Sequence, residues 1–228
     1  MRGTMRVALE IGPRGKKVVA VAPDWPGLAR GASTDEKALE RLAAYRERYA
    51  PVAEYTDLTA EFAAATDLDV VEYYAGTGST DFWGISFAFS EIDRQEMSRE
   101  RLERALQLLS ACWAFFDDVR SRVSPEMKRG IRGGGRDRDR IVSHTLVSEL
   151  DMSKKVGVLT PFSAMLANEG LAEHREAYCA AILAHCEEGK LARKWPLSYL
   201  IRHTAFHTLD HAWEMEDKDL TVQPHGTS

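Results

Sequence analysis

Three histidines, His203, His207 and His211, follow one another at intervals of four residues near the C-terminal end of the chain. In a helix, an interval of four turns through about 400°, so neighbours in this series lie on one face, one turn apart. Two imidazoles in that relation can bind one divalent ion through their neutral nitrogens. Because chance pairs of this spacing are frequent, a metal site also needs a ligand from another element.

His144 is the natural candidate for that further ligand. It lies between Ile141 and Leu146, on a segment that should border the core. A lone histidine there would more often be a satisfied core residue, but the second histidine-bearing helix favours a ligand, since bundles build metal sites from inward side chains on facing helices. We therefore predict that His144 binds a metal together with two neighbouring histidines of this series. Imidazole ligands suit zinc, nickel, iron and copper alike, which leaves the ion open.

Two further residues could support such a site. Glu214 lies three residues beyond His211 and could orient its ring through a hydrogen bond, although a solvated helix end is the simpler interpretation. If the metal belongs to an enzyme, Arg202 or Glu214 could orient its substrate. His174 and His185 lie among charged residues, and His225 lies in the polar end of the chain, so we expect none of these three to take part.

The segments before residue 76 have the pattern of a small α/β unit. Short runs rich in Val, Ala and Ile flank Gly12-Pro13-Arg14-Gly15, which predicts two strands joined by a tight turn. The helix that follows should be capped by Ser33, with Glu36 completing a capping box, and should end at Pro51. The expected elements are strand, strand, helix, short helix and strand, at residues 6–11, 17–22, 34–49, 57–65 and 69–74.

Residues 76–90 are rich in aromatic side chains and alternate only in part. They could form a strand, or a loop folded onto the helices. Filling of an interdomain core by these aromatics is favoured over a lid that covers a ligand.

After residue 90 the apolar residues recur at helical spacing. Ser98 should cap the first helix, and Asp137 or Asp139 the second. The expected long helices cover residues 98–123, 137–156, 171–188 and 197–216, with a short one at 161–165. Four amphipathic helices in this length predict an α+β protein that ends in an up-down four-helix bundle. The expected division is a small domain at 1–92, the bundle at 93–217 and a polar tail at 218–228.

Composition sets limits on function. The chain has 228 residues and a net charge of −5, which argues against a general nucleic-acid surface. Three widely spaced cysteines do not make a disulfide framework, and no signal peptide or membrane segment is evident, so we expect a cytoplasmic protein without a membrane partner. The glycine-rich basic segment from Lys128 to Arg140 is expected to be a solvated loop, with anion binding as the alternative. Dimerisation is possible.

The residues also carry two resemblances. The stretch His203-Thr-Ala-Phe-His207-Thr-Leu-Asp-His211-Ala-Trp-Glu-Met-Glu-Asp217, together with His144, resembles the DinB/YfiT-like superfamily over roughly residues 94 to 217, and the Gly133-Gly134-Gly135 run is similar to some of its members. The N-terminal part, with Val7-Ala-Leu-Glu-Ile11, Asp24-Trp-Pro-Gly27 and Thr34-Asp-Glu-Lys-Ala-Leu39, is similar to HicB-like domains over about 50 residues.

The DinB/YfiT-like resemblance implies a four-helix bundle in which one histidine of the second helix and an HxxxH pair of the last helix bind a divalent metal such as zinc, nickel or iron. On that pattern the ligands here are His144, His207 and His211, and His203 lies one turn outside them. It also implies a metal- and thiol-dependent transferase, or a related hydrolase or isomerase, that acts on a small electrophile with a low-molecular-weight thiol. The alternatives are a non-catalytic stress protein that binds a metal or ligand, and an antitoxin-like interaction module, as the HicB-like segment suggests.

Overall fold

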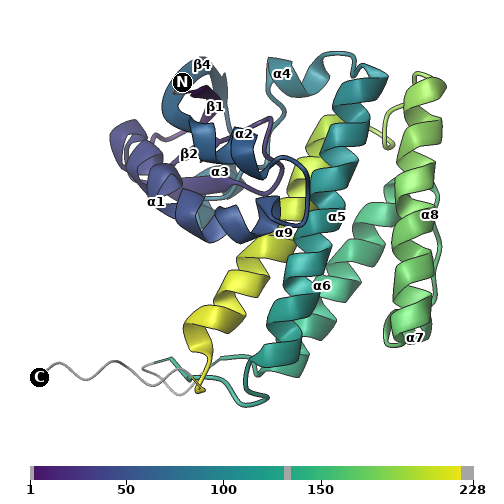
Figure 1. Ribbon diagram of the computed structural model, residues 1–228. Helices are drawn as coiled ribbons and strands as arrows, with labels where there is room; N and C mark the ends of the chain where they lie inside the picture. The colour runs from purple at the N-terminus through teal and green to yellow at the C-terminus, as the bar shows by residue number, and fades with distance from the viewer. Residues whose placement is uncertain (1–2, 131–134, 222–228) are drawn as a thin grey trace, which may run out of the picture.

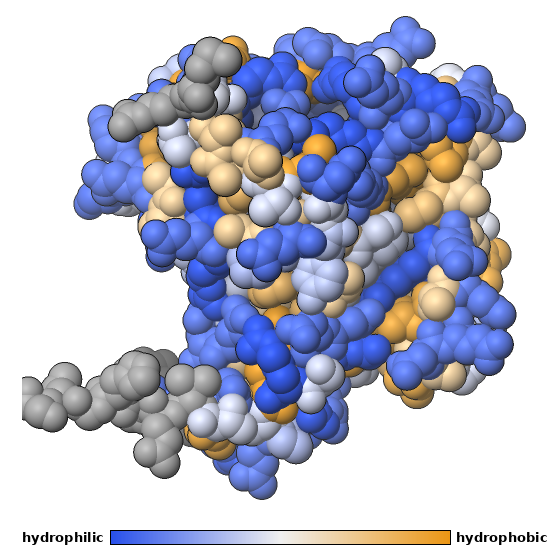
Figure 2. All heavy atoms as spheres, viewed as in Figure 1, coloured by the Kyte–Doolittle hydropathy of each residue, from blue (hydrophilic) through white to orange (hydrophobic). Residues whose placement is uncertain are grey.

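The protein is a mixed α and β structure in which a small sheet lies beside a group of long helices (Figure 1). The computed structural model describes residues 3–130 and 135–221. Among these residues, no helix combines the length and the apolar character that crossing a membrane would require. Charged and polar side chains cover most of the face in Figure 2, with small apolar areas between them.

The sheet has four strands in the order β3-β2-β1-β4. The β1–β2 and β2–β3 pairs are antiparallel. The β1–β4 pair is parallel, and a parallel pair needs a long crossover connection, usually a helical one. The strands are β1 (Gly3–Ile11), β2 (Val18–Val21), β3 (Ala29–Ala32) and β4 (Ala65–Ala75). Strand β3 was not predicted, because Ala29-Arg30-Gly31-Ala32 lacks the β-branched and aromatic residues that signal a strand.

Helices α1 (Asp35–Ala53) and α2 (Thr59–Ala64) connect β3 to β4. Two predictions about α1 were wrong. Its N-cap is Thr34 rather than Ser33, since the Thr34 hydroxyl accepts a hydrogen bond from the Lys37 backbone N–H. The helix also continues past Pro51 to Ala53. Proline lacks a backbone N–H and so removes one hydrogen bond of the helix. Pro51 lies in the last turn of α1, and the helix continues for two residues beyond it.

The aromatic segment after β4 forms α3 (Gly78–Trp83), an irregular stretch and α4 (Glu91–Arg94). The expectation that its aromatics fill a core was wrong for Phe82 and Trp83, which are 70% and 64% exposed. Phe87 and Phe89 are partly buried and lie against the last helix, where Phe89 meets the Tyr199 ring.

The C-terminal part contains four long helices close to their predicted positions. They are α5 (Arg99–Arg122), α6 (Arg138–Ser153), α8 (Asn168–Glu187) and α9 (Leu197–Lys218), with η1 (Lys154–Val156) and α7 (Phe162–Met165) between α6 and α8. Ser98 and Asp137 are the N-caps of α5 and α6, as expected. Helix α9 extends to Lys218, and Asp219 accepts a hydrogen bond from the Ser124 backbone N–H, so the predicted tail begins later than residue 218.

The directions of these helices differ from the predicted up-down order. Residues 154–167 return along the helices before α8 begins, so α6 and α8 run in the same direction, opposite to α5 and α9 (Figure 1). Ion pairs mark these directions: Arg99 at the start of α5 contacts Glu187 at the end of α8, and Arg122 contacts Glu216 where α5 and α9 both end. The long α6–α8 connection carries no strong sequence signal for its path.

One continuous hydrophobic core joins the sheet to the helices. It runs from Met5 on β1 through α1 and α5 to Met215 on α9. Helix α1 covers one face of the sheet, and Phe206 of α9 packs on the other face against Val19 and Val21. Helix α9 is therefore packed against the sheet on one side and against α5 and α6 on the other.

Candidate metal centre

The three histidines predicted as ligands come together where α6 crosses α9. His144 projects from the first half of α6, and His207 and His211 project from one face of α9. The centroids of their rings lie 4.6–5.1 Å apart, and one ligand atom from each histidine lies within 4.8 Å of the others. His203, one turn earlier, lies outside this group, as the resemblance implies. We refer to His144, His207 and His211 as the histidine trio.

The trio fits a single transition-metal ion. An imidazole nitrogen binds zinc at about 2.0–2.1 Å, so two ligands of one ion are at most about 4.2 Å apart. The ligand atoms lie within 4.8 Å of one another, close to that limit. All three donors are nitrogens, a set that suits zinc, nickel or iron better than magnesium or calcium.

The surroundings keep His144 and His207 neutral. The pKa of His207 falls to about 3, mainly because the ring is buried and next because His211 and His144 lie close to it. Burial followed by the effect of His211 also lowers the pKa of His144. Near neutral pH these two imidazoles therefore offer lone pairs, which is the form that binds a metal.

Glu214 contacts one histidine of the trio, His211. Its carboxylate accepts a hydrogen bond from the His211 Nδ1 atom at 2.7 Å and also contacts the Lys218 ammonium group. The hydrogen bond from His211 is the main reason that the pKa of Glu214 falls to about 2. An ionised carboxylate only accepts hydrogen bonds, so the His211 Nδ1–H is the donor and Nε2 lies on the side of the ring away from Glu214. The contact orients the ring as the sequence suggested.

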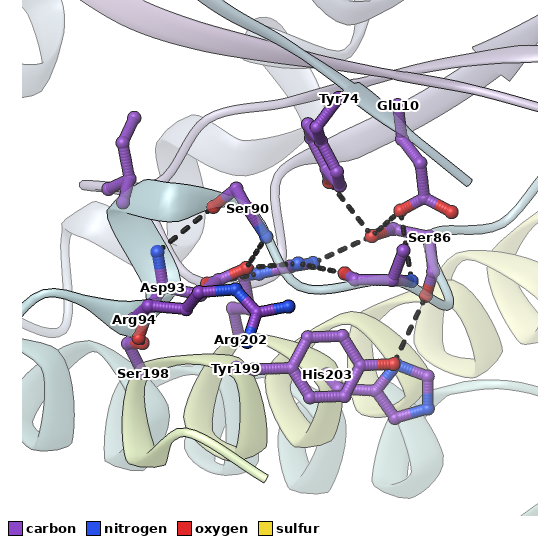
Figure 3. Close-up of polar contacts among 12 residues, drawn as sticks. Glu10, Tyr74, Ser86, Ser90, Asp93, Arg94, Ser198, Tyr199, Arg202 and His203 are labelled. Carbon is purple, nitrogen blue, oxygen red and sulfur yellow. Dashed lines mark hydrogen bonds and ion pairs between the residues drawn. The ribbon is translucent and has the colours of Figure 1, made fainter.

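Arg202 does not lie at the trio. Its guanidinium donates hydrogen bonds to both carboxylate oxygens of Asp93, at 2.8 and 2.7 Å, and further hydrogen bonds to the Ser86 hydroxyl and the Ala88 carbonyl (Figure 3). The pair is almost fully buried, with side chains 7% and 2% exposed. Arg202 therefore holds the aromatic segment and α4 against α9.

The Arg202 network continues to Glu10 on β1, which the sequence did not single out. The Glu10 carboxylate is fully buried and accepts hydrogen bonds from the hydroxyls of Thr80 and Ser86 and from the backbone N–H groups of Phe87 and Ala88. The sequence alone did not indicate that Glu10 is buried, because which face of the sheet a strand residue occupies depends on the register of that strand. This network positions the residues next to His203.

The remaining described histidines have structural partners. His203 stacks on Tyr199 with ring centroids 5.2 Å apart. His174 is fully buried with its Nδ1 atom 2.8 Å from the Thr160 hydroxyl, so the expectation that it lies beside exposed charges was wrong. His185 contacts the backbone carbonyl of Ala181.

Arg136, within the basic segment, acts on the trio through its charge. The positive charge of Arg136 contributes to the low pKa of His144 and His207, after burial and the neighbouring histidines. Residues 131–134, with most of the glycine run, and residues 222–228, with His225, lie outside the described part of the chain.

In comparisons with family models, with curated proteins and with solved structures, no match to this chain was found.

Proposed function

We propose that this chain is a DinB-like four-helix bundle protein that binds one divalent ion, zinc, nickel or iron, through His144, His207 and His211. We further propose that it acts on a small electrophile with a low-molecular-weight thiol, as an S-transferase or a related hydrolase or isomerase. The convergence of three imidazoles from α6 and α9 carries the proposal.

Two features of the fold support the bundle assignment. The four helices α5, α6, α8 and α9 lie side by side, and the trio takes one histidine from the second and two from the last. That distribution is what the resemblance implies for the metal ligands.

The chemistry follows from the number and kind of ligands. Three protein ligands leave a coordination position open, whereas a purely structural zinc site is usually closed by four. A divalent ion held there would act as a Lewis acid that lowers the pKa of a bound thiol or water. The chain supplies neutral imidazoles, and Glu214 fixes the tautomer of His211. His144 and His207 are partly buried.

The first test is the metal content of protein purified without a histidine tag, measured by elemental mass spectrometry. We expect close to one divalent ion per chain in the wild type, and loss of that ion in each of His144→Ala, His207→Ala and His211→Ala. His185→Ala is the matched control, since this histidine contacts only a backbone carbonyl among the described residues and should leave the metal content unchanged.

Two outcomes would contradict parts of the proposal. A wild-type protein that takes up neither zinc, nickel nor cobalt would exclude the metal site. A protein that binds one ion, but whose cobalt(II) spectrum is unaffected by added thiol, would keep the site and exclude thiol chemistry at it. Thiol-dependent consumption of an electrophile that disappears in His207→Ala would support the complete proposal.

A further inference from the structure

Helices α6 and α9 lie side by side and run in opposite directions. At one end of their contact, His144 meets His207 and His211. Further along, the Thr204 hydroxyl lies 3.1 Å from the Met152 sulfur. Beyond that point Lys155, in η1, lies against Trp195 just before α9 begins. The trio and Lys155 therefore mark the two ends of one helix–helix contact.

Aromatic rings line the part of α9 between these ends. The His203 ring lies 5.8 Å from the Phe87 ring and 5.6 Å from the Trp195 ring, centroid to centroid. All three side chains are partly buried rather than enclosed. His203 also precedes His207 by one helical turn, so these rings continue directly from the trio. We call His203, Phe87 and Trp195 the aromatic strip.

Lys155 places a positive charge at the far end of the aromatic strip. Its ammonium nitrogen lies 3.9 Å from the centroid of the Trp195 ring, and within the described part of the chain it forms no ion pair. The nearest acidic group, Asp151, is paired with Lys154 at 2.9 Å. Arg193 adds a second positive charge there, and burial followed by Arg193 lowers the pKa of Lys155.

We infer that the substrate of the metal site is an elongated, largely apolar molecule that carries an anionic group at the end remote from the reacting atom. The reacting atom would lie at the trio, the apolar body on the aromatic strip and the anion at Lys155. From His207 to Tyr199 is eight residues of helix, about 12 Å, which sets the scale of the molecule. This inference rests on the proposed function, because it assigns the substrate of that site.

Thiols of different length and charge test the inference on the cobalt(II)-loaded protein. The probes are mercaptoacetate, ω-mercaptooctanoate and the neutral ω-mercaptooctanol, which share the metal-binding group. Affinity is read from the change in the cobalt spectrum and, independently, from isothermal titration calorimetry. We expect ω-mercaptooctanoate to bind at least about tenfold more tightly than mercaptoacetate, from burial of its methylene groups, and about tenfold more tightly than ω-mercaptooctanol, from its carboxylate.

Variants locate the effect. Lys155→Met keeps an unbranched side chain over Trp195, and it should abolish the preference for the carboxylate while leaving ω-mercaptooctanol binding unchanged. Lys155→Arg should restore the preference. Lys154→Met, which removes the neighbouring exposed lysine, is the matched control and should bind all three probes as the wild type does.

Each result has one meaning. Equal affinities for the three thiols on a protein that binds cobalt would overturn the inference and leave the proposed metal site standing. A carboxylate preference that survives in Lys155→Met would also overturn it, because the anion would then bind elsewhere. A protein that binds no cobalt would remove both the proposed function and the inference. A preference that is lost in Lys155→Met and restored in Lys155→Arg would establish it.

Discussion

The contact between Glu214 and His211 predicts how much the acidic side chain contributes to metal binding. In Glu214→Gln an ionised acceptor becomes a neutral amide of nearly the same shape. The present hydrogen bond is short, at 2.7 Å, and the Glu214 side chain is 25% exposed. A hydrogen bond to a charged group contributes about 1.5–3 kcal/mol, and each 1.4 kcal/mol corresponds to about tenfold in affinity.

We therefore expect zinc to bind Glu214→Gln about 10- to 100-fold more weakly than it binds the wild type, which is also the usual effect of removing the partner of a ligating histidine. The assay is competition with a chromophoric chelator at pH 7. Lys218→Met removes the second partner of Glu214 and separates its contribution from that of His211.

Glu216→Gln is the control for a general loss of negative charge on α9. Glu216 pairs with Arg48 and Arg122 and contacts none of the trio among the described residues. Equal zinc affinity in Glu214→Gln and wild type would refute the argument that this carboxylate orients His211. So would equal weakening in Glu214→Gln and Glu216→Gln, which would reveal a long-range charge effect.

Three further predictions concern the scaffold. Asp93→Asn leaves the buried Arg202 cation without its partner, so urea unfolding should show a loss of about 3–5 kcal/mol. Burial lowers the pKa of His174 to about 4, so the unfolded chain binds more protons between about pH 6.5 and 4, and stability should fall by about 3 kcal/mol as the pH drops through that window. His174→Gln should flatten that pH dependence in urea titrations at pH 7 and 5, and an unchanged slope would contradict the assignment. Gly27→Ala should lower the thermal midpoint, because Gly27 has φ +93° and its new methyl group would meet the Leu209 side chain at 2.7 Å.

The helices and the trio could be predicted because their signals are local. Helical spacing and the cap at Ser98 placed α5, and the interval of four in the histidines placed His207 and His211 on one face of α9. The pairing of these two with His144 required only that α6 and α9 face each other. Glu214 was found for the same reason, since an interval of three on a helix brings side chains together.

What could not be predicted depends on contacts between distant segments. Strand β3 exists because Ala29–Ala32 pairs with β2, and not because its residues favour a strand. The role of Arg202 depends on Asp93, which precedes it by more than a hundred residues, and a lone arginine on a helix does not reveal such a partner. Phe82 and Trp83 have the composition of core residues, yet α3 turns them outward.

The N-terminal part contributes directly to the placement of α9 and therefore of the trio. The Arg30 guanidinium of β3 lies between two rings, 3.7 Å from the Tyr45 centroid and 4.5 Å from the Trp213 centroid. Arg48 of α1 donates hydrogen bonds to the Trp213 carbonyl and to Glu216. Trp213 is two residues from His211, so these contacts fix the helix within one turn of a predicted ligand. The division after residue 92 stays a prediction from sequence, and across it the packing is continuous. Because α9 is held in this way from outside, the N-terminal part helps to keep His207 and His211 facing His144.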